Sequence, residues 1–101
     1  MLGTEEILNT LSQNISDLSF KYYIERIGIF GSYATGRQTE DSDIDFVVQF
    51  RSDCPHLFDV KCNLKEYLRS LFGKDVDVAN LKFIKSFVME YIEPEIRYVD
   101  K

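Results

Sequence analysis

Two aspartates separated by one residue, Asp43 and Asp45, are the side chains of this sequence best suited to chemistry. They open an apolar run that predicts a strand over residues 43–50. Residues two apart in a strand project from the same face, so the two carboxylates lie side by side. Carboxylates in that position repel each other, and a hard dication such as Mg²⁺ is the natural reason to keep both ionised. The pair therefore predicts a metal site, with two ions roughly 3.5–4 Å apart if the site holds both.

A glycine-serine pair, Gly31-Ser32, ends the preceding apolar run of residues 22–30, which predicts the first strand. Glycine lets the backbone approach a phosphate chain, and the serine adds a hydroxyl donor at the start of the next turn. A Gly-Ser pair alone is usually a simple turn, and an Asp-x-Asp alone is often a solvated loop edge. Here ten residues separate Ser32 from Asp43, and the combination predicts a phosphoryl-transfer site that takes a nucleoside triphosphate.

A third carboxylate is needed to complete such a site, where it orients or deprotonates the attacking hydroxyl. The strand predicted over residues 75–80 offers Asp75 and Asp77. Asp77 lies between two valines, and we expect it to be the more buried of the two acids. Asp75 follows Gly73-Lys74 and is typical of a solvated strand start. We therefore predict Asp77 as the third carboxylate, because a buried acid needs a partner to offset its cost.

The elements that must position these residues alternate between helix and strand. We expect a helix over residues 4–15 with Thr4 as its N-cap, a connection over 16–21, a short helical turn at 32–36 and a polar loop at 37–42. Helices follow over 56–72 and 81–92, with a short edge strand at 96–99. The helix over 56–72 is a crossover, so the strands beside it should be parallel. This predicts an α/β (α+β) fold, a small mixed sheet with helices on one face and an open acidic face.

The last predicted helix has an apolar stripe that allows two interpretations. Core packing is the expected role of such a stripe, because aromatic side chains dominate ordinary cores. A surface for a partner protein is the alternative. The stripe consists of Phe83, Ile84, Phe87, Val88 and Tyr91.

Composition narrows the class of protein. The 101 residues suit a single domain over 1–101. A net charge of −5 argues against a direct nucleic-acid surface. No apolar run approaches the roughly 20 residues of a membrane span, and the two cysteines form no disulfide framework. We therefore expect a cytoplasmic protein.

The stretch GSYATG…SDIDFVV resembles a known signature, that of the DNA polymerase beta-like nucleotidyltransferase superfamily and its small prokaryotic branch, the minimal nucleotidyltransferases (MNT). The likeness runs from about residue 23 to residue 99. It implies the nucleotidyltransferase fold, phosphate binding by Gly31 and Ser32, and a catalytic, metal-binding set of Asp43, Asp45 and Asp77. Many members carry arginine where this chain has Thr35, and Arg37, two positions on, is the candidate cation for the phosphates.

The resemblance also implies a partner. Minimal nucleotidyltransferases are commonly paired with a HEPN-domain toxin, and members are described as transferring AMP from ATP to a tyrosine of that toxin. By resemblance the chain is a Mg²⁺-dependent adenylyltransferase and the antitoxin of such a pair. Two alternatives stay open: an antitoxin that only occludes its partner, and transfer to a small molecule such as an antibiotic.

Overall fold

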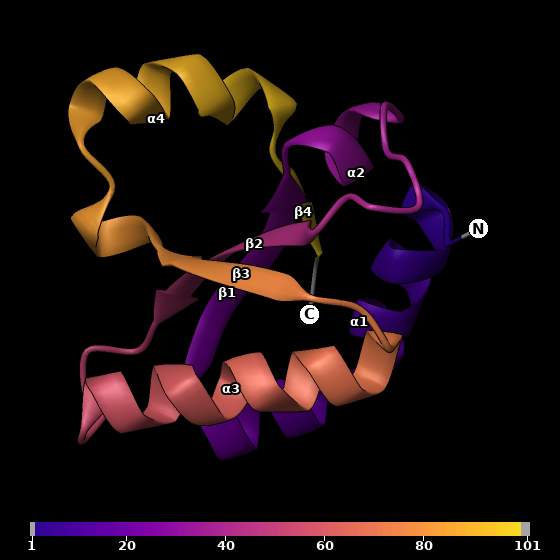
Figure 1. Ribbon diagram of the computed structural model, residues 1–101. Helices are drawn as coiled ribbons and strands as arrows, with labels where there is room; N and C mark the ends of the chain where they lie inside the picture. Colours follow the sequence, from indigo (N-terminus) through magenta and orange to yellow (C-terminus); the bar gives the residue numbers. More distant parts are fainter. Residues whose placement is uncertain (1, 100–101) are drawn as a thin grey trace.

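The computed structural model of the protein describes residues 2–99 and is built around a sheet of four strands (Figure 1). The strands are β1 (Ile24–Phe30), β2 (Ile44–Phe50), β3 (Val76–Asn80) and β4 (Arg97–Val99), in the spatial order β3-β2-β1-β4. β2 and β3 are parallel, whereas β1 is antiparallel to both β2 and β4. The mixed sheet, the parallel pair and the edge strand near the C-terminus are thus as predicted.

Helical elements connect the strands. They are α1 (Thr4–Tyr22), α2 (Ser32–Thr35), α3 (Leu57–Phe72) and α4 (Ser86–Ile92), with 3₁₀ turns η1 (Leu81–Phe83) and η2 (Glu93–Glu95). α3 is the predicted crossover between β2 and β3, and Gly73 ends it in the left-handed conformation, with its N–H donating to the carbonyl of Arg69. Among the described residues, no helix is long and apolar enough to cross a membrane.

The main core lies between one face of the sheet and the two long helices, α1 and α3, which share that side (Figure 1). Alternate residues of β2 point into it, because successive strand residues face opposite sides. Phe46 is fully buried there and its ring lies 5.8 Å from that of Phe72, at the end of α3. The fully buried side chains of this core include Ile7, Leu11, Ile24, Ile27, Ile29, Tyr33, Ile44, Phe46, Val48, Leu64 and Leu68.

The first helix is longer than predicted. α1 continues to Tyr22, so the expected connection over residues 16–21 is helical and the predicted first strand begins two residues late. Leu18 extends the apolar stripe of α1 into the core at 1% exposure, and this packing outweighs the weak helix propensity of the serines around it. The N-cap of α1 is Gly3, and not Thr4 as predicted. The hydroxyl of Thr4 instead donates a hydrogen bond to the carbonyl of Tyr33.

The predicted helix over residues 81–92 is also wrong in part. The segment starts as the 3₁₀ turn η1, is extended at Ile84, and becomes helical only at Ser86. Asn80 favours this break, because its side-chain oxygen accepts a hydrogen bond from the backbone N–H of Lys82 at 3.0 Å. The expected core packing of its aromatic stripe is wrong as well, since most of those side chains are exposed.

The other face of the sheet carries the functional candidates. Asp45 and Asp77 project from it, and α4 lies on that side of the sheet (Figure 1). Val47, on the same face, is fully buried but outside the main core, and Ile92 is the buried residue of α4. This face is therefore open except where the α4 segment crosses it.

The packing predicts a large difference between two phenylalanines. Phe46→Ala should destabilise the protein by about 3–5 kcal/mol, because it removes a fully buried ring and leaves a cavity. Phe58→Ala, at an exposed position of α3, should change stability by less than about 0.5 kcal/mol. Urea denaturation of both variants checks this, and similar losses for the two would contradict the assignment of the core.

Candidate functional site

The C-terminal end of β1 and the N-terminal ends of β2 and β3 lie together at one end of the sheet and form the site. β1 runs antiparallel to β2, so its C-terminal end lies beside the start of β2, with Phe30 opposite Asp45. β3 runs parallel to β2, which places Asp77 directly beside Asp45. The Gly31-Ser32 turn therefore lies next to two carboxylates that are 32 residues apart in the sequence.

Gly31 is required at its position for two reasons. Its backbone has φ 73° and ψ −150°, a conformation that is essentially restricted to glycine. A Cβ atom there would lie only 2.5 Å from Oδ2 of Asp45. Immediately afterwards the chain enters α2, and the Gly31 carbonyl accepts hydrogen bonds from the N–H groups of Ala34 and Thr35. The turn thus brings bare backbone against the carboxylate of Asp45.

The electrostatics of the site centre on Asp45. Partial burial raises the pKa of its carboxyl above the ordinary value, and the nearby charges of Asp77 and Asp43 raise the pKa further. Holding the three acids close together therefore opposes the ionised form of Asp45. Perturbation of this kind is common at functional sites, where a bound cation relieves it.

Asp43 is less closely placed than the sequence suggests. It lies one residue before β2, is exposed, and lines a surface hollow with Lys65, Arg69 and Asp75. Within residues 2–99, no three His, Cys, Asp or Glu side chains already surround one point as metal ligands would. The three aspartates offer the oxygen donors that Mg²⁺ prefers, but only Asp45 and Asp77 are brought into register.

The two acids of the third strand have different surroundings. Asp75 is exposed and forms a 3.4 Å ion pair with Arg69, which makes it the solvated strand start that we predicted. Asp77 is the register partner of Asp45, and its Oδ1 accepts a hydrogen bond from the N–H of Val78 at 3.0 Å. The expectation that Asp77 is buried is wrong: its side chain is exposed, because it projects from the open face of an edge strand.

Arg37 lies close to the Gly31-Ser32 turn. Its backbone N–H donates to the Ser32 carbonyl at 2.9 Å, and its Nε donates to the Thr35 hydroxyl at 2.8 Å. Its guanidinium also reaches Glu95 at 3.3 Å in an exposed ion pair, which contributes little to stability. The guanidinium therefore lies close to the Gly31-Ser32 turn, and its role as the cation for the phosphates stays a prediction.

Two neighbours of the site were not foreseen from the sequence. Glu95 reaches Arg37 from 58 residues away, and Nζ of Lys74 donates to the Glu40 carbonyl at 2.7 Å. The second contact ties the polar loop before Asp43 to the turn before β3. Neither residue belongs to a local pattern that would have indicated its role.

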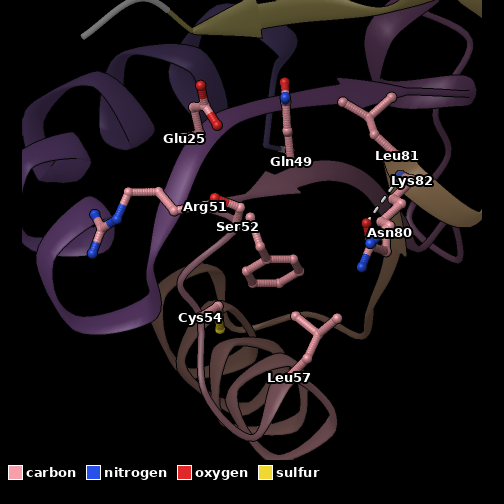
Figure 2. A pocket seen from close by; sticks show the side chains of 10 residues that line it. Glu25, Gln49, Arg51, Ser52, Cys54, Leu57, Asn80, Leu81 and Lys82 are labelled. Atoms are coloured by element: carbon pink, nitrogen blue, oxygen red, sulfur yellow. Dashed lines mark hydrogen bonds between the residues drawn. The ribbon is translucent and has the colours of Figure 1, made fainter.

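The opposite end of the sheet has a pocket of about 640 Å³ that contains none of the predicted site residues (Figure 2). Gln49 and Asn80 lie at the C-terminal ends of the parallel strands and line it together with Lys82. Gln49 is four residues beyond Asp45, which is about 13 Å along a strand. The pocket is thus separate from the carboxylates.

Replacement of Gly31 tests the close contact with Asp45. Gly31→Ala should destabilise the fold by more than about 2 kcal/mol, because it adds both backbone strain and a clash. Gly36→Ala is the control, since Gly36 has φ 75° but open space around it; it should cost about 1–2 kcal/mol. In an Asp45→Ala background, urea denaturation should show a smaller cost for Gly31→Ala. An unchanged cost would mean that strain alone is responsible.

Replacement of Asp45 tests the repulsion among the acids. The pKa of folded Asp45 is raised above its ordinary value of 3.8, so its ionised form weakens the fold at neutral pH. This cost is complete above the raised pKa and disappears as the pH falls from there toward 3.8. In the presence of EDTA, Asp45→Asn should therefore raise Tm at pH 7, and the gain should shrink near pH 4. Asp41→Asn, in the exposed loop, is the control, and an equal gain there would contradict the assignment.

Known proteins resemble this chain over nearly its whole length. The protein adenylyltransferase MntA of Thermococcus cleftensis is 36% identical to this chain over 99 residues. The match covers 98% of this chain and 98% of MntA. A Methanocaldococcus jannaschii protein, provisionally named a protein adenylyltransferase, is 39% identical over 100 residues, which are 98% of this chain and 100% of that protein.

Solved structures share the fold. The structure of a provisionally assigned minimal nucleotidyltransferase superposes with a TM-score of 0.77 at 26% identity, covering 95% of each chain. A chain from a toxin–antitoxin crystal structure with AMP-PNP superposes with a TM-score of 0.66 at 25% identity, covering 96% of this chain and 72% of that one.

The model of the nucleotidyltransferase domain family matches residues 11–99, a span that includes the Gly31-Ser32 turn and all three aspartates. This match covers most of the chain and agrees with the relatives and with the fold. The chain therefore belongs to the nucleotidyltransferase domain family.

Proposed function

We propose that this nucleotidyltransferase transfers AMP from ATP to a hydroxyl, specifically a tyrosine, of a partner protein in the cytoplasm, with Mg²⁺ as cofactor. The observation that carries the proposal is the register pairing of Asp45 with Asp77 beside the Gly31-Ser32 turn. The full-length likeness to protein adenylyltransferase MntA supports AMP transfer to a protein. The likeness to a toxin–antitoxin chain with AMP-PNP supports ATP as the donor.

The partner that fits best is a HEPN-domain toxin, with this chain as its antitoxin. The resemblance of GSYATG…SDIDFVV to the minimal nucleotidyltransferases motivates this choice. The described residues form one small sheet whose carboxylate-bearing face is open except where the α4 segment crosses it (Figure 1). We therefore expect the acceptor hydroxyl to arrive on another protein.

Each residue of the site has a role in this proposal. The backbone of Gly31 and the hydroxyl of Ser32 hold the phosphates, and Arg37 adds a positive charge. Asp43, Asp45 and Asp77 would hold Mg²⁺, which when bound neutralises charge on the phosphates. Asp77 orients the acceptor hydroxyl and accepts its proton. The hydroxyl oxygen forms a bond to the α-phosphorus as the bond from that phosphorus to pyrophosphate breaks.

The three carboxylates provide the main test. The purified chain is incubated with the product of its neighbouring gene, which the proposal expects to be a HEPN-domain protein, together with Mg²⁺ and labelled ATP. We expect label on that protein, and loss of labelling by roughly 10³-fold or more in the Asp43→Ala, Asp45→Ala, Asp77→Ala triple variant. EDTA should abolish labelling of the wild type. Labelling of neither the HEPN-domain protein nor small acceptors would reject the proposal.

A second candidate function is neutralisation by binding alone. The exposed apolar side chains of the α4 segment favour it, because a partner that binds them could be occluded without any transfer of AMP. The two functions differ in the toxin-neutralising activity of the triple variant. If neutralisation is enzymatic, the triple variant should no longer neutralise the toxin. If neutralisation is by occlusion, the triple variant should still neutralise it. Transfer to an antibiotic, the third possibility, would be supported by resistance conferred by this chain alone.

A further inference from the structure

Four large side chains stand exposed on the segment between β3 and β4. We call them the α4 ridge: Phe83, Phe87, Val88 and Tyr91, with exposed fractions of 67%, 70%, 37% and 80%. Ile92 is the buried residue of the whole segment over residues 81–96. Packing among residues 2–99 therefore does not account for the apolar character of this segment.

The exposed apolar area of the α4 ridge is large enough to contribute to a binding surface. Aromatic side chains of this size present about 150–250 Å² each, so the ridge exposes on the order of 400 Å². Apolar patches that large on a monomer are often functional. A stable protein interface needs about 800 Å² on each partner, so the ridge would form roughly half of one side. The remaining half must come from polar surface beside it.

The candidate active site supplies that neighbouring surface. β3 carries Asp77 and continues directly into η1, at the start of the ridge. At the other end η2 lies near the Gly31-Ser32 turn, where Glu95 contacts Arg37. α4 lies on the side of the sheet from which Asp45 and Asp77 project (Figure 1). The ridge and the carboxylates therefore belong to elements on the same side of the sheet, and we expect a protein seated on the ridge to approach the carboxylates.

Charge indicates the chemistry of that protein. Residues 86–96 include three glutamates and no lysine or arginine, whereas Lys82 and Lys85 flank Phe83 at the start of the ridge. Glu95 contacts Arg37, which follows the Gly31-Ser32 turn, so the acidic part of the segment is the part that ends toward that turn. A partner surface that complements the ridge and the aspartates is apolar at its centre and basic around the acceptor hydroxyl.

We propose that the α4 ridge is the docking surface for the acceptor protein of the transfer reaction. This inference rests on the proposed function, and it adds the surface through which the acceptor is recognised. Apolar side chains that pack on Phe87 and Tyr91 position the acceptor, and its basic rim faces the glutamates. A second copy of this chain on the same ridge would cover the approach to the carboxylates.

A pair of double variants tests the proposal. Phe87→Ser with Tyr91→Ser removes the centre of the α4 ridge. Phe20→Ser with Phe58→Ser is the matched control, because it removes two exposed aromatic rings from α1 and α3, on the other side of the sheet. All four side chains are exposed, so thermal melting should be the same for both variants and the wild type.

Binding to the HEPN-domain protein is measured first, in the triple aspartate background, so that it does not depend on transfer. We expect the ridge variant to bind with a Kd raised roughly 30-fold or more, and the control to bind like the parent. In the catalytic background the ridge variant should show a higher KM for the HEPN-domain protein. Its kcat at saturating acceptor should be unchanged.

The outcomes separate this inference from the proposed function. Loss of binding only in the ridge variant, with no labelling by the wild type, supports the docking surface and rejects the enzyme. Equal binding by ridge variant and control overturns the docking surface, as does failure of the wild type to bind. Light scattering tests whether the ridge binds a second copy of this chain. If the wild type is a dimer, the ridge variant is a monomer and the ridge variant still binds the HEPN-domain protein, the ridge is a dimer interface and the docking proposal is overturned.

Discussion

The contact between the backbone of Gly31 and the carboxylate of Asp45 is the constraint on which the site depends. A side chain at residue 31 would lie 2.5 Å from Oδ2 of Asp45, so the carboxylate fits only against bare backbone. Partial burial there, together with the charges of Asp77 and Asp43, raises the pKa of Asp45. The fold thus holds an acid where its ionised form is disfavoured, and stability elsewhere must offset that cost. The core between the sheet and the helices α1 and α3 provides that stability.

The topology makes the site possible in so short a chain. The antiparallel pairing of β1 with β2 places the Gly31-Ser32 turn beside Asp45, and the crossover helix α3 returns the chain so that Asp77 also lies beside Asp45. Each connection also packs against the core: α3 buries Leu64 and Leu68, and α2 buries Tyr33. The same elements therefore stabilise the sheet and align the residues of the site.

The α4 segment has a different physical character from the rest of the molecule. Ile92 is its buried residue and contacts occur at its two ends, while its aromatic side chains remain in solvent. Within the core, the apolar stripes of α1 and α3 are covered by the sheet. A segment whose apolar side chains are left over after the core is complete has the composition of an interface.

The sequence by itself determined the strands, the crossover and the family, because strand periodicity, glycine positions and the Gly-Ser to Asp-x-Asp spacing are local signals. Only the tertiary structure decided which apolar residues are buried. Leu18 packs in the core and extends α1 by nearly two turns, whereas Phe87 and Tyr91 stay exposed among residues 2–99. It also decided that Asp77 is exposed and that Glu95 meets Arg37. Burial and long-range pairing depend on which surfaces the packed elements leave exposed. A local sequence pattern does not contain that information, because it describes one element at a time.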